Sequence, residues 1–270
     1  MNKGEGDFFT GMLVGSMMGG GKKNNDNGGC LSSILGLIIL GVAIFLGYNF
    51  GLPGIITGAV IVFIVIPVSI GVVRSHIKHN IQTAEEAWQL FKQGNYTLAL
   101  EKAERVADKN ADAADLAGIL YLNGEGCDKN VEKAFEYFEL GKDKNMEAKA
   151  NYALMLIEGK GCKQNIKTGR SELIHAATVG HNALATMRLG EFQLMGEYGF
   201  EKNIEKGMRN LRIAVDAGYP YAMYLVGAMQ YTGKDGVPEN KEKGIELIKK
   251  AAELGVQDAV ELLENINELK

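Results

Sequence analysis

The chain has 270 residues with 29 Lys or Arg and 33 Asp or Glu, which gives a formal net charge of −4. It has no basic run of the kind that binds phosphates, so we expect no nucleic-acid partner. Its three cysteines, Cys30, Cys127 and Cys162, are too few and of the wrong parity for a disulfide framework.

The first segment, residues 1–30, is rich in glycine, and we expect it to be flexible. Within it, residues 8–18 are apolar but too few to span a bilayer. This run could lie in the membrane interface or contribute to self-association, so its role stays open.

Residues 31–73 contain no charged side chain and form two apolar runs, 31–50 and 55–73, joined by Gly-Leu-Pro-Gly. At about 1.5 Å per residue, each run is long enough to cross a hydrocarbon core of about 30 Å. Glycine and proline end helices, so the linker predicts a tight reversal. The sequence therefore predicts a two-helix transmembrane hairpin.

Basic residues near the hairpin predict its orientation. Lys22 and Lys23 precede the first run, Arg74 and Lys78 follow the second, and the linker has none. The positive-inside rule places both ends in the cytoplasm. We therefore expect a two-pass membrane protein whose soluble part is cytoplasmic. Small residues four apart within the runs allow close helix packing, either within the hairpin or between copies.

Residues 80–110 predict one plain helical hairpin, with helices over 83–92 and 97–109 around Gly94. From residue 111 onward the chain repeats. The loop glycines Gly124, Gly159, Gly196 and Gly233 are separated by 35, 37 and 37 residues. A period of this size is typical of stacked helical hairpins, because one hairpin cannot bury its apolar face alone.

Each repeat is predicted to be a helix, a glycine-bearing loop, a second helix and a tight turn. Small residues recur where the two helices cross: Gly118, Ala153, Gly190 and Gly227 in the first helix, with Ala134, Gly169, Gly207 and Gly244 in the second. An asparagine precedes each second helix as a predicted cap: Asn130, Asn165, Asn203 and Asn240. Residues that favour a left-handed turn follow it: Asn145, Gly180, Gly218 and Gly255.

One motif, which recurs along the chain, carries a family resemblance. It combines small residues, a tyrosine and loop glycines with Asn-x-x-Lys-Ala at 130–134: Ala113, Ala117, Gly118, Tyr121, Gly124 and Gly126. It resembles the Sel-one-like repeat family, a branch of the tetratricopeptide superfamily, over roughly 111–268. The resemblance implies an all-α, right-handed solenoid that serves as an adaptor or scaffold without catalytic residues. We expect it to fill 111–270, closed by a C-terminal cap helix, after a tetratricopeptide-like unit at 80–110.

Residue types that could support chemistry have simpler explanations. Cys127 and Cys162 occupy the repeat position held by Phe200 and Val237, so we expect a packing role. No phosphate-binding glycine motif and no Ser-His-Asp pattern stands out in the sequence. We therefore expect no enzyme activity, no cofactor and no metal.

The candidate partner-binding residues lie among the aromatic positions of the first helices: Asn151, Arg188, Glu191 and Tyr224. Solenoids present their first helices along a concave side, and aromatic and arginine side chains anchor interfaces well. The favoured function is a membrane-anchored adaptor that binds a protein or peptide on this side. The alternative is a structural or assembly subunit of a homo-oligomeric membrane complex or channel, which the oligomeric state in detergent would distinguish.

Overall fold

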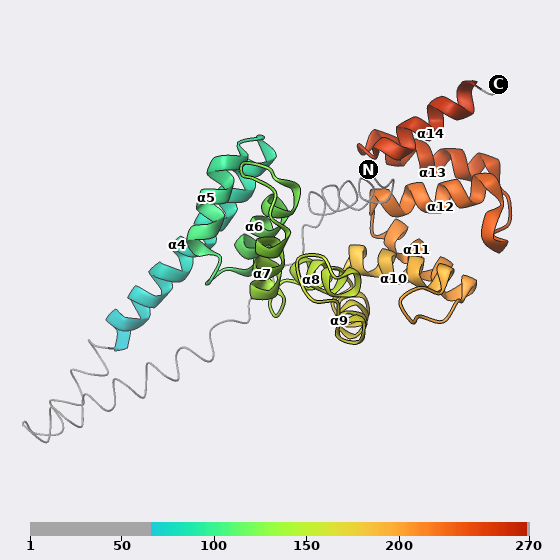
Figure 1. The fold of residues 1–270 in the computed structure, drawn as a ribbon. Coiled ribbons are helices and arrows are strands. Elements are labelled where there is room, and N and C mark those ends of the chain that lie inside the picture. The colour runs from blue at the N-terminus through green and yellow to red at the C-terminus, as the bar shows by residue number, and fades with distance from the viewer. Residues whose placement is uncertain (1–65, 269–270) are drawn as a thin grey trace, which may run out of the picture. The chain divides into compact units, whose positions relative to one another are not determined.

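The computed structural model describes residues 66–268, and every regular element in that range is helical (Figure 1). In chain order these are α4 Ile66–Lys92, α5 Tyr96–Val106, α6 Ala111–Asn123, α7 Val131–Gly141, α8 Met146–Glu158, α9 Ile166–Thr178, α10 Ala183–Met195, α11 Ile204–Asp216, α12 Pro220–Thr232, the short 3₁₀ helix η2 Lys234–Gly236, α13 Lys241–Glu253 and α14 Gln257–Glu268. The predicted all-α solenoid of helix-turn-helix repeats is confirmed.

The chain divides into two compact units within α4, and the division falls between Thr83 and Ala84. We expected a helix from Thr83, but α4 runs without interruption from Ile66. Its upstream part carries exposed apolar side chains: Val68, Ile70, Val72, Ile77 and Ile81. No helix between residues 66 and 268 is long and apolar enough to cross a membrane. The first predicted span, 31–50, and residues 55–65 of the second lie outside the described residues.

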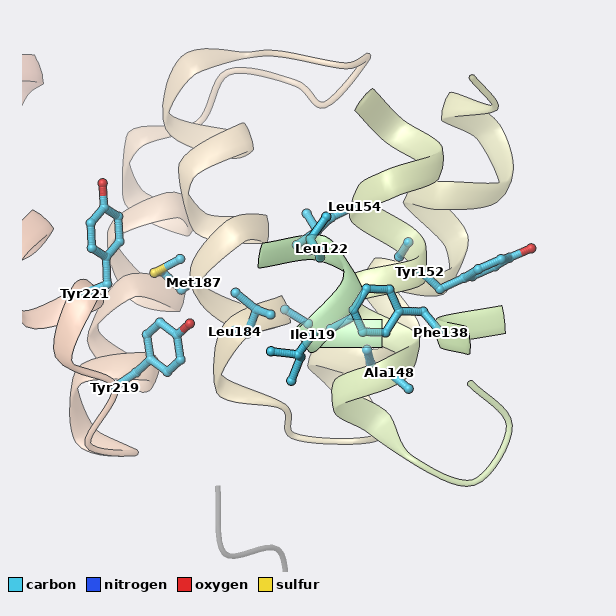
Figure 2. Packing of buried hydrophobic residues seen from close by; sticks show 14 of the residues in the cluster. Ile119, Leu122, Phe138, Ala148, Tyr152, Leu154, Leu184, Met187, Tyr219 and Tyr221 are labelled. Carbon is cyan, nitrogen blue, oxygen red and sulfur yellow. The ribbon is translucent and has the colours of Figure 1, made fainter. Parts of the chain in front are cut away.

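The repeats are the helix pairs α6 with α7, α8 with α9, α10 with α11 and α12 with α13, and α14 packs against α13. One apolar core runs through them, and Figure 2 shows side chains from successive repeats packing there. Each second helix contributes one apolar side chain that is fully buried in this core: Phe138, Leu173, Leu211 and Ile248.

Asparagine caps begin both helices of most repeats. The four predicted caps are confirmed; Asn130, for example, accepts a hydrogen bond from the Lys133 amide at 2.9 Å. Asn145 and Asn182 cap the first helices α8 and α10 in the same way. Each cap satisfies an amide that the first turn of a helix leaves unpaired, so the caps fix where helices begin.

The predicted left-handed turns are confirmed at Gly218 (φ 84°) and Gly255 (φ 89°) but not elsewhere. After α9 the left-handed residue is His181 (φ 49°), not Gly180. Gly180 lies at a close approach instead, because an added Cβ would lie 2.7 Å from the Met146 sulfur and 2.8 Å from the Ala176 carbonyl oxygen. Asn145 is extended at φ −123°, because it caps α8 rather than ending α7.

Gly218 provides a test of backbone strain without steric clash, because an added Cβ there has nothing within 4 Å. A non-glycine residue in the left-handed region costs about 1–2 kcal/mol. We expect Gly218→Val to lower the melting temperature of the full chain in detergent, measured by circular dichroism. Gly218→Asn should be milder, because asparagine tolerates this conformation. Equal effects of the two substitutions would contradict the assigned conformation.

Candidate protein-binding face

The small residue at each helix crossing shows which way the first helix faces. An added Cβ on Gly118 would lie 2.6 Å from the Phe138 ring of α7, so this position faces the second helix. At 100° per residue, the side chain two positions earlier points about 160° away. In each first helix we take the residue two before the small crossing residue and the residue directly after it, and we call these eight residues the inner face. They are Leu116, Ile119, Asn151, Leu154, Arg188, Glu191, Leu225 and Ala228.

Three of the four predicted partner-binding residues belong to the inner face, and Tyr224 is adjacent to it. Asn151 is 0% exposed and donates a hydrogen bond to Asp115 at 3.3 Å. In this conformation its side chain has no surface to offer a partner. Tyr224 is half-buried, with its ring 5.5 Å from that of Tyr221. The structure thus groups the four positions but gives them unequal access to solvent.

Arg188 joins two repeats through a pair of carboxylates. Its Nη1 lies 2.9 Å from Glu191 Oε2 on the same helix, and its Nη2 lies 3.0 Å from Glu158 Oε1 on α8. The three side chains are 18%, 15% and 11% exposed. Burial raises the pKa of Glu191, and the neighbouring guanidinium only partly opposes that shift. The charges are therefore shielded enough from solvent to interact strongly.

A second link between repeats was not anticipated from sequence. Asn145 caps α8 through its oxygen, and its nitrogen donates to Asp112 of the preceding repeat at 2.8 Å. Asn182 caps α10 and donates to Glu147 in the same way. Each asparagine therefore fixes a helix start and the register of two repeats together. The signal was present in sequence, because the Asn and acidic positions share one period.

This link ends at α12, where both partners change together. Tyr219 stands at the cap position of α12 and makes no side-chain capping bond. In the preceding repeat, Leu184 stands where the earlier repeats have Asp112 and Glu147. Tyr219 and Leu184 are each 3% exposed. A tyrosine packing near a leucine replaces an amide bonded to a carboxylate, and Figure 2 shows the pair in the packed region. The last repeat is therefore stacked by apolar burial at this position.

Asp115 predicts a pH-dependent stability. Burial raises the pKa of its carboxyl well above the usual range, the charge of Glu147 adds to the shift, and the Asn151 hydrogen bond opposes it. The unfolded carboxyl ionises near pH 4. The pKa of Asp115 is higher in the folded state than in the unfolded state. Its contribution to stability is therefore complete below the unfolded-state pKa and is lost as pH rises through the folded-state pKa.

We therefore expect Asp115→Asn to raise the melting temperature of the full chain in detergent at pH 8 and to change it little at pH 4. Each unit of pKa shift corresponds to about 1.4 kcal/mol. Thermal unfolding at the two pH values, followed by circular dichroism, measures the difference. An equal loss of stability at both would show that the carboxylate is needed in its ionised form.

The two described cysteines are free thiols that pack against the core. Burial raises the pKa of both Cys127 and Cys162, so little reactive thiolate forms near neutral pH. The equivalent Phe200 and Val237 are buried more deeply, at 7% and 4% exposure. This arrangement agrees with the predicted packing role.

Comparison with known families settles what these repeats are. The family model described as the Sel1 repeat matches residues 111–146, 147–170, 183–219 and 220–256. This chain carries Sel1 repeats over residues 111–170 and 183–256. Such repeats are similar to tetratricopeptide repeats and are generally non-catalytic scaffolds, which agrees with the sequence resemblance.

A solved structure of a Sel1 repeat protein has a similar fold. The crystal structure of a Sel1 repeat protein from Oxalobacter formigenes has a TM-score of 0.52 and 23% sequence identity, over 65% of this chain and 71% of that one. A putative Sel1 repeat protein from Klebsiella pneumoniae subsp. pneumoniae has a TM-score of 0.49 and 20% identity, over 70% and 93% of the two chains. A search of curated proteins found no significant match.

Proposed function

We propose that this chain is a membrane-anchored, non-catalytic scaffold that binds a protein or peptide on the inner face of α10 and α12. One observation carries the binding site: Tyr224, Leu225, Arg188 and Glu191 keep partial solvent access on adjacent inner helices. Aromatic and arginine side chains that a partner can desolvate supply most of the binding energy in protein interfaces. The Sel1 repeat adds the expectation of a protein partner.

The binding site is tested by replacing Tyr224 and Leu225 together. The chain is purified in nanodiscs, and proteins that bind it are captured from a membrane extract and identified. We expect Tyr224→Ala combined with Leu225→Asp to lose at least tenfold of a captured partner, about 1.4 kcal/mol or more. Ile213→Asp is the control, because Ile213 is 50% exposed on the second helix α11. Equal loss in both variants, or loss in neither, would contradict an inner-face site.

Membrane anchoring is supported by the uncharged stretch 31–73 and by the exposed apolar side chains at the start of α4. Val68, Ile70 and Val72 are 60%, 41% and 51% exposed, and Arg74 follows directly. Exposed apolar side chains are favourable in the lipid hydrocarbon, and a basic residue is favourable at the membrane–water interface on the cytoplasmic side. We place the repeats in the cytoplasm on the same basis.

Cysteine labelling in sealed cells tests this orientation. A single cysteine placed at Gly51 should react with a membrane-impermeant maleimide, whereas one at Lys270 should react only after lysis. Background is removed by replacing Cys30, Cys127 and Cys162 with serine. Labelling of Lys270→Cys in intact cells would show that the repeats face outward and would end the proposed localisation.

A further inference from the structure

Helix α4 carries one apolar line of side chains along its whole length. Its members recur at alternating steps of four and three residues, and all but one are apolar: Ile66, Ile70, Val73, Ile77, Asn80, Ala84, Ala87 and Phe91. This spacing places them on one side of the helix, and we call them the α4 stripe. A mean step of about 3.5 residues is the spacing at which helices pack side by side in a coiled coil.

The C-terminal end of the α4 stripe packs within the repeats. Ala84, Ala87 and Phe91 belong to the apolar core. The Phe91 ring lies 5.5 Å from the ring of Tyr96, the first residue of α5. The stripe is therefore a helix-packing surface at this end, and the same surface continues upstream along α4.

Farther upstream, the α4 stripe is exposed just beyond the predicted membrane span. Ile77 is 43% exposed, and Ile81, which borders the stripe, is 44% exposed. They are the only apolar residues over 74–82, where the other seven are polar or charged. Before this segment, Val68 and Val72 are exposed on other sides of the helix as well. Apolar side chains all round a helix are suited to lipid, whereas a narrow apolar line between polar sides is suited to another helix.

A second copy of the chain fits this exposed part better than a lipid surface does. A helix that lies flat in the membrane interface buries one whole apolar face. At 100° per residue, Arg74 and Lys78 lie on one side of Ile77 and His76 lies on the other, so the apolar line is narrow. Copies held in one membrane by the same anchor also point their α4 helices in the same direction, so equivalent positions of the stripe can meet.

We propose that α4 packs against α4 of a second copy through Ile70, Ile77 and Asn80, as a parallel coiled coil at the membrane surface. The parallel direction rests on the membrane anchor proposed above. Each Asn80 then faces the same asparagine of the other copy, and the two amides can hydrogen-bond. A single polar position in an apolar seam fixes the register of the helices. Two sets of repeats held together bind a partner with two binding motifs more tightly than one set does.

Cysteine crosslinking in membranes tests the contact. Single cysteines are placed at each position over 74–82 in a chain whose own three cysteines are replaced with serine, and a short bis-maleimide joins cysteines that face each other. We expect roughly tenfold more crosslinked dimer at Ile77→Cys than at Ser75→Cys, because the two side chains point about 160° apart. A stripe that lies on lipid, or on other residues of its own chain, gives low yields at every position. That result, or equal yields all round the helix, would overturn the proposal.

A matched pair of variants tests whether the stripe drives the association. Ile77→Asp combined with Ile81→Asp should weaken self-association of the full chain in detergent by at least about tenfold, measured by sedimentation over a range of concentrations. Ser75→Asp combined with His79→Asp adds two carboxylates at the same spacing on the opposite side and should leave self-association unchanged. All four side chains are exposed, so both variants keep the repeats folded. Equal effects of the two variants, or an unmodified chain that is monomeric, would contradict the α4 contact.

The outcome is independent of the tests of the proposed function. Partner capture by the same variants is scored separately: self-association without capture refutes only the proposed binding site, and capture by a chain that does not self-associate refutes only this inference. Failure of the anchor itself is seen in the labelling of Gly51→Cys, which does not depend on contact between copies.

Discussion

Replacing Arg188 with leucine should destabilise the chain by about 3 kcal/mol, the lower end of the cost of breaking a buried ion pair. The guanidinium bridges Glu158 and Glu191 across two repeats, so its loss leaves the shielded Glu191 carboxylate without this cation, while Glu158 keeps Lys160 at 2.9 Å. At roughly 2–4 °C per kcal/mol, the melting temperature should fall by about 6–12 °C. Thermal unfolding of the full chain in detergent, followed by circular dichroism, measures it.

The effect of Arg188→Leu should also depend on pH. Burial already raises the pKa of Glu191, and without the cation that pKa should rise further, so protonation of Glu191 relieves the loss at low pH. The stability loss should therefore be smaller at pH 4 than at pH 8. Arg209→Leu is the control, because Arg209 pairs with Glu205 while the two side chains are 64% and 84% exposed. An exposed pair contributes at most about 1 kcal/mol. Equal losses in both variants would mean that the shielded pairs of Arg188 contribute no more than an exposed pair.

Gly190→Val should be the other strongly destabilising substitution, at about 3 kcal/mol. An added Cβ on Gly190 lies 2.9 Å from the Gly207 carbonyl oxygen and 3.1 Å from the Leu211 amide nitrogen. Both neighbours are backbone-constrained, so α10 and α11 must separate and loosen the core around them. The melting temperature measured by circular dichroism should fall by roughly 6–12 °C.

The repeat provides a control for this crossing. Ala153 holds the equivalent position in α8, where its partner is Gly169. Ala153→Gly introduces no clash and should cost only the helix propensity difference, about 1 kcal/mol. Gly190→Ala should fall between the two variants. If Gly190→Val is no worse than Ala153→Gly, close approach is not what selects glycine there.

Much of the fold was predictable because the same local sequence signals recur in each repeat. The spacing of Gly124, Gly159 and their successors predicted the helix pairs, and each of these glycines ends a first helix in a left-handed conformation. The asparagine caps before the second helices were predicted for the same reason. A cap or a left-handed turn depends on a few neighbouring residues, so its signal survives in sequence alone.

The errors arose where one residue type can serve two roles. Asn145 and Gly180 fit the pattern of a left-handed turn, but the first caps the next helix and the second makes room for Met146. The candidate site shows the same limit. Asn151 lies on the inner face as the periodicity predicts, but its side chain is fully buried, which the periodicity does not predict.

By itself, the sequence determined the helix pairs, their caps and the crossing glycines, because these follow from local conformation and a fixed period. Only the tertiary structure decided how the repeats are joined. Arg188 meets Glu158 across 30 residues, and Asn182 meets Glu147 across 35. These contacts form when stacking brings separate helices together, and no local preference encodes them. Burial is decided the same way, since the solvent exposure of a side chain depends on every segment packed around it.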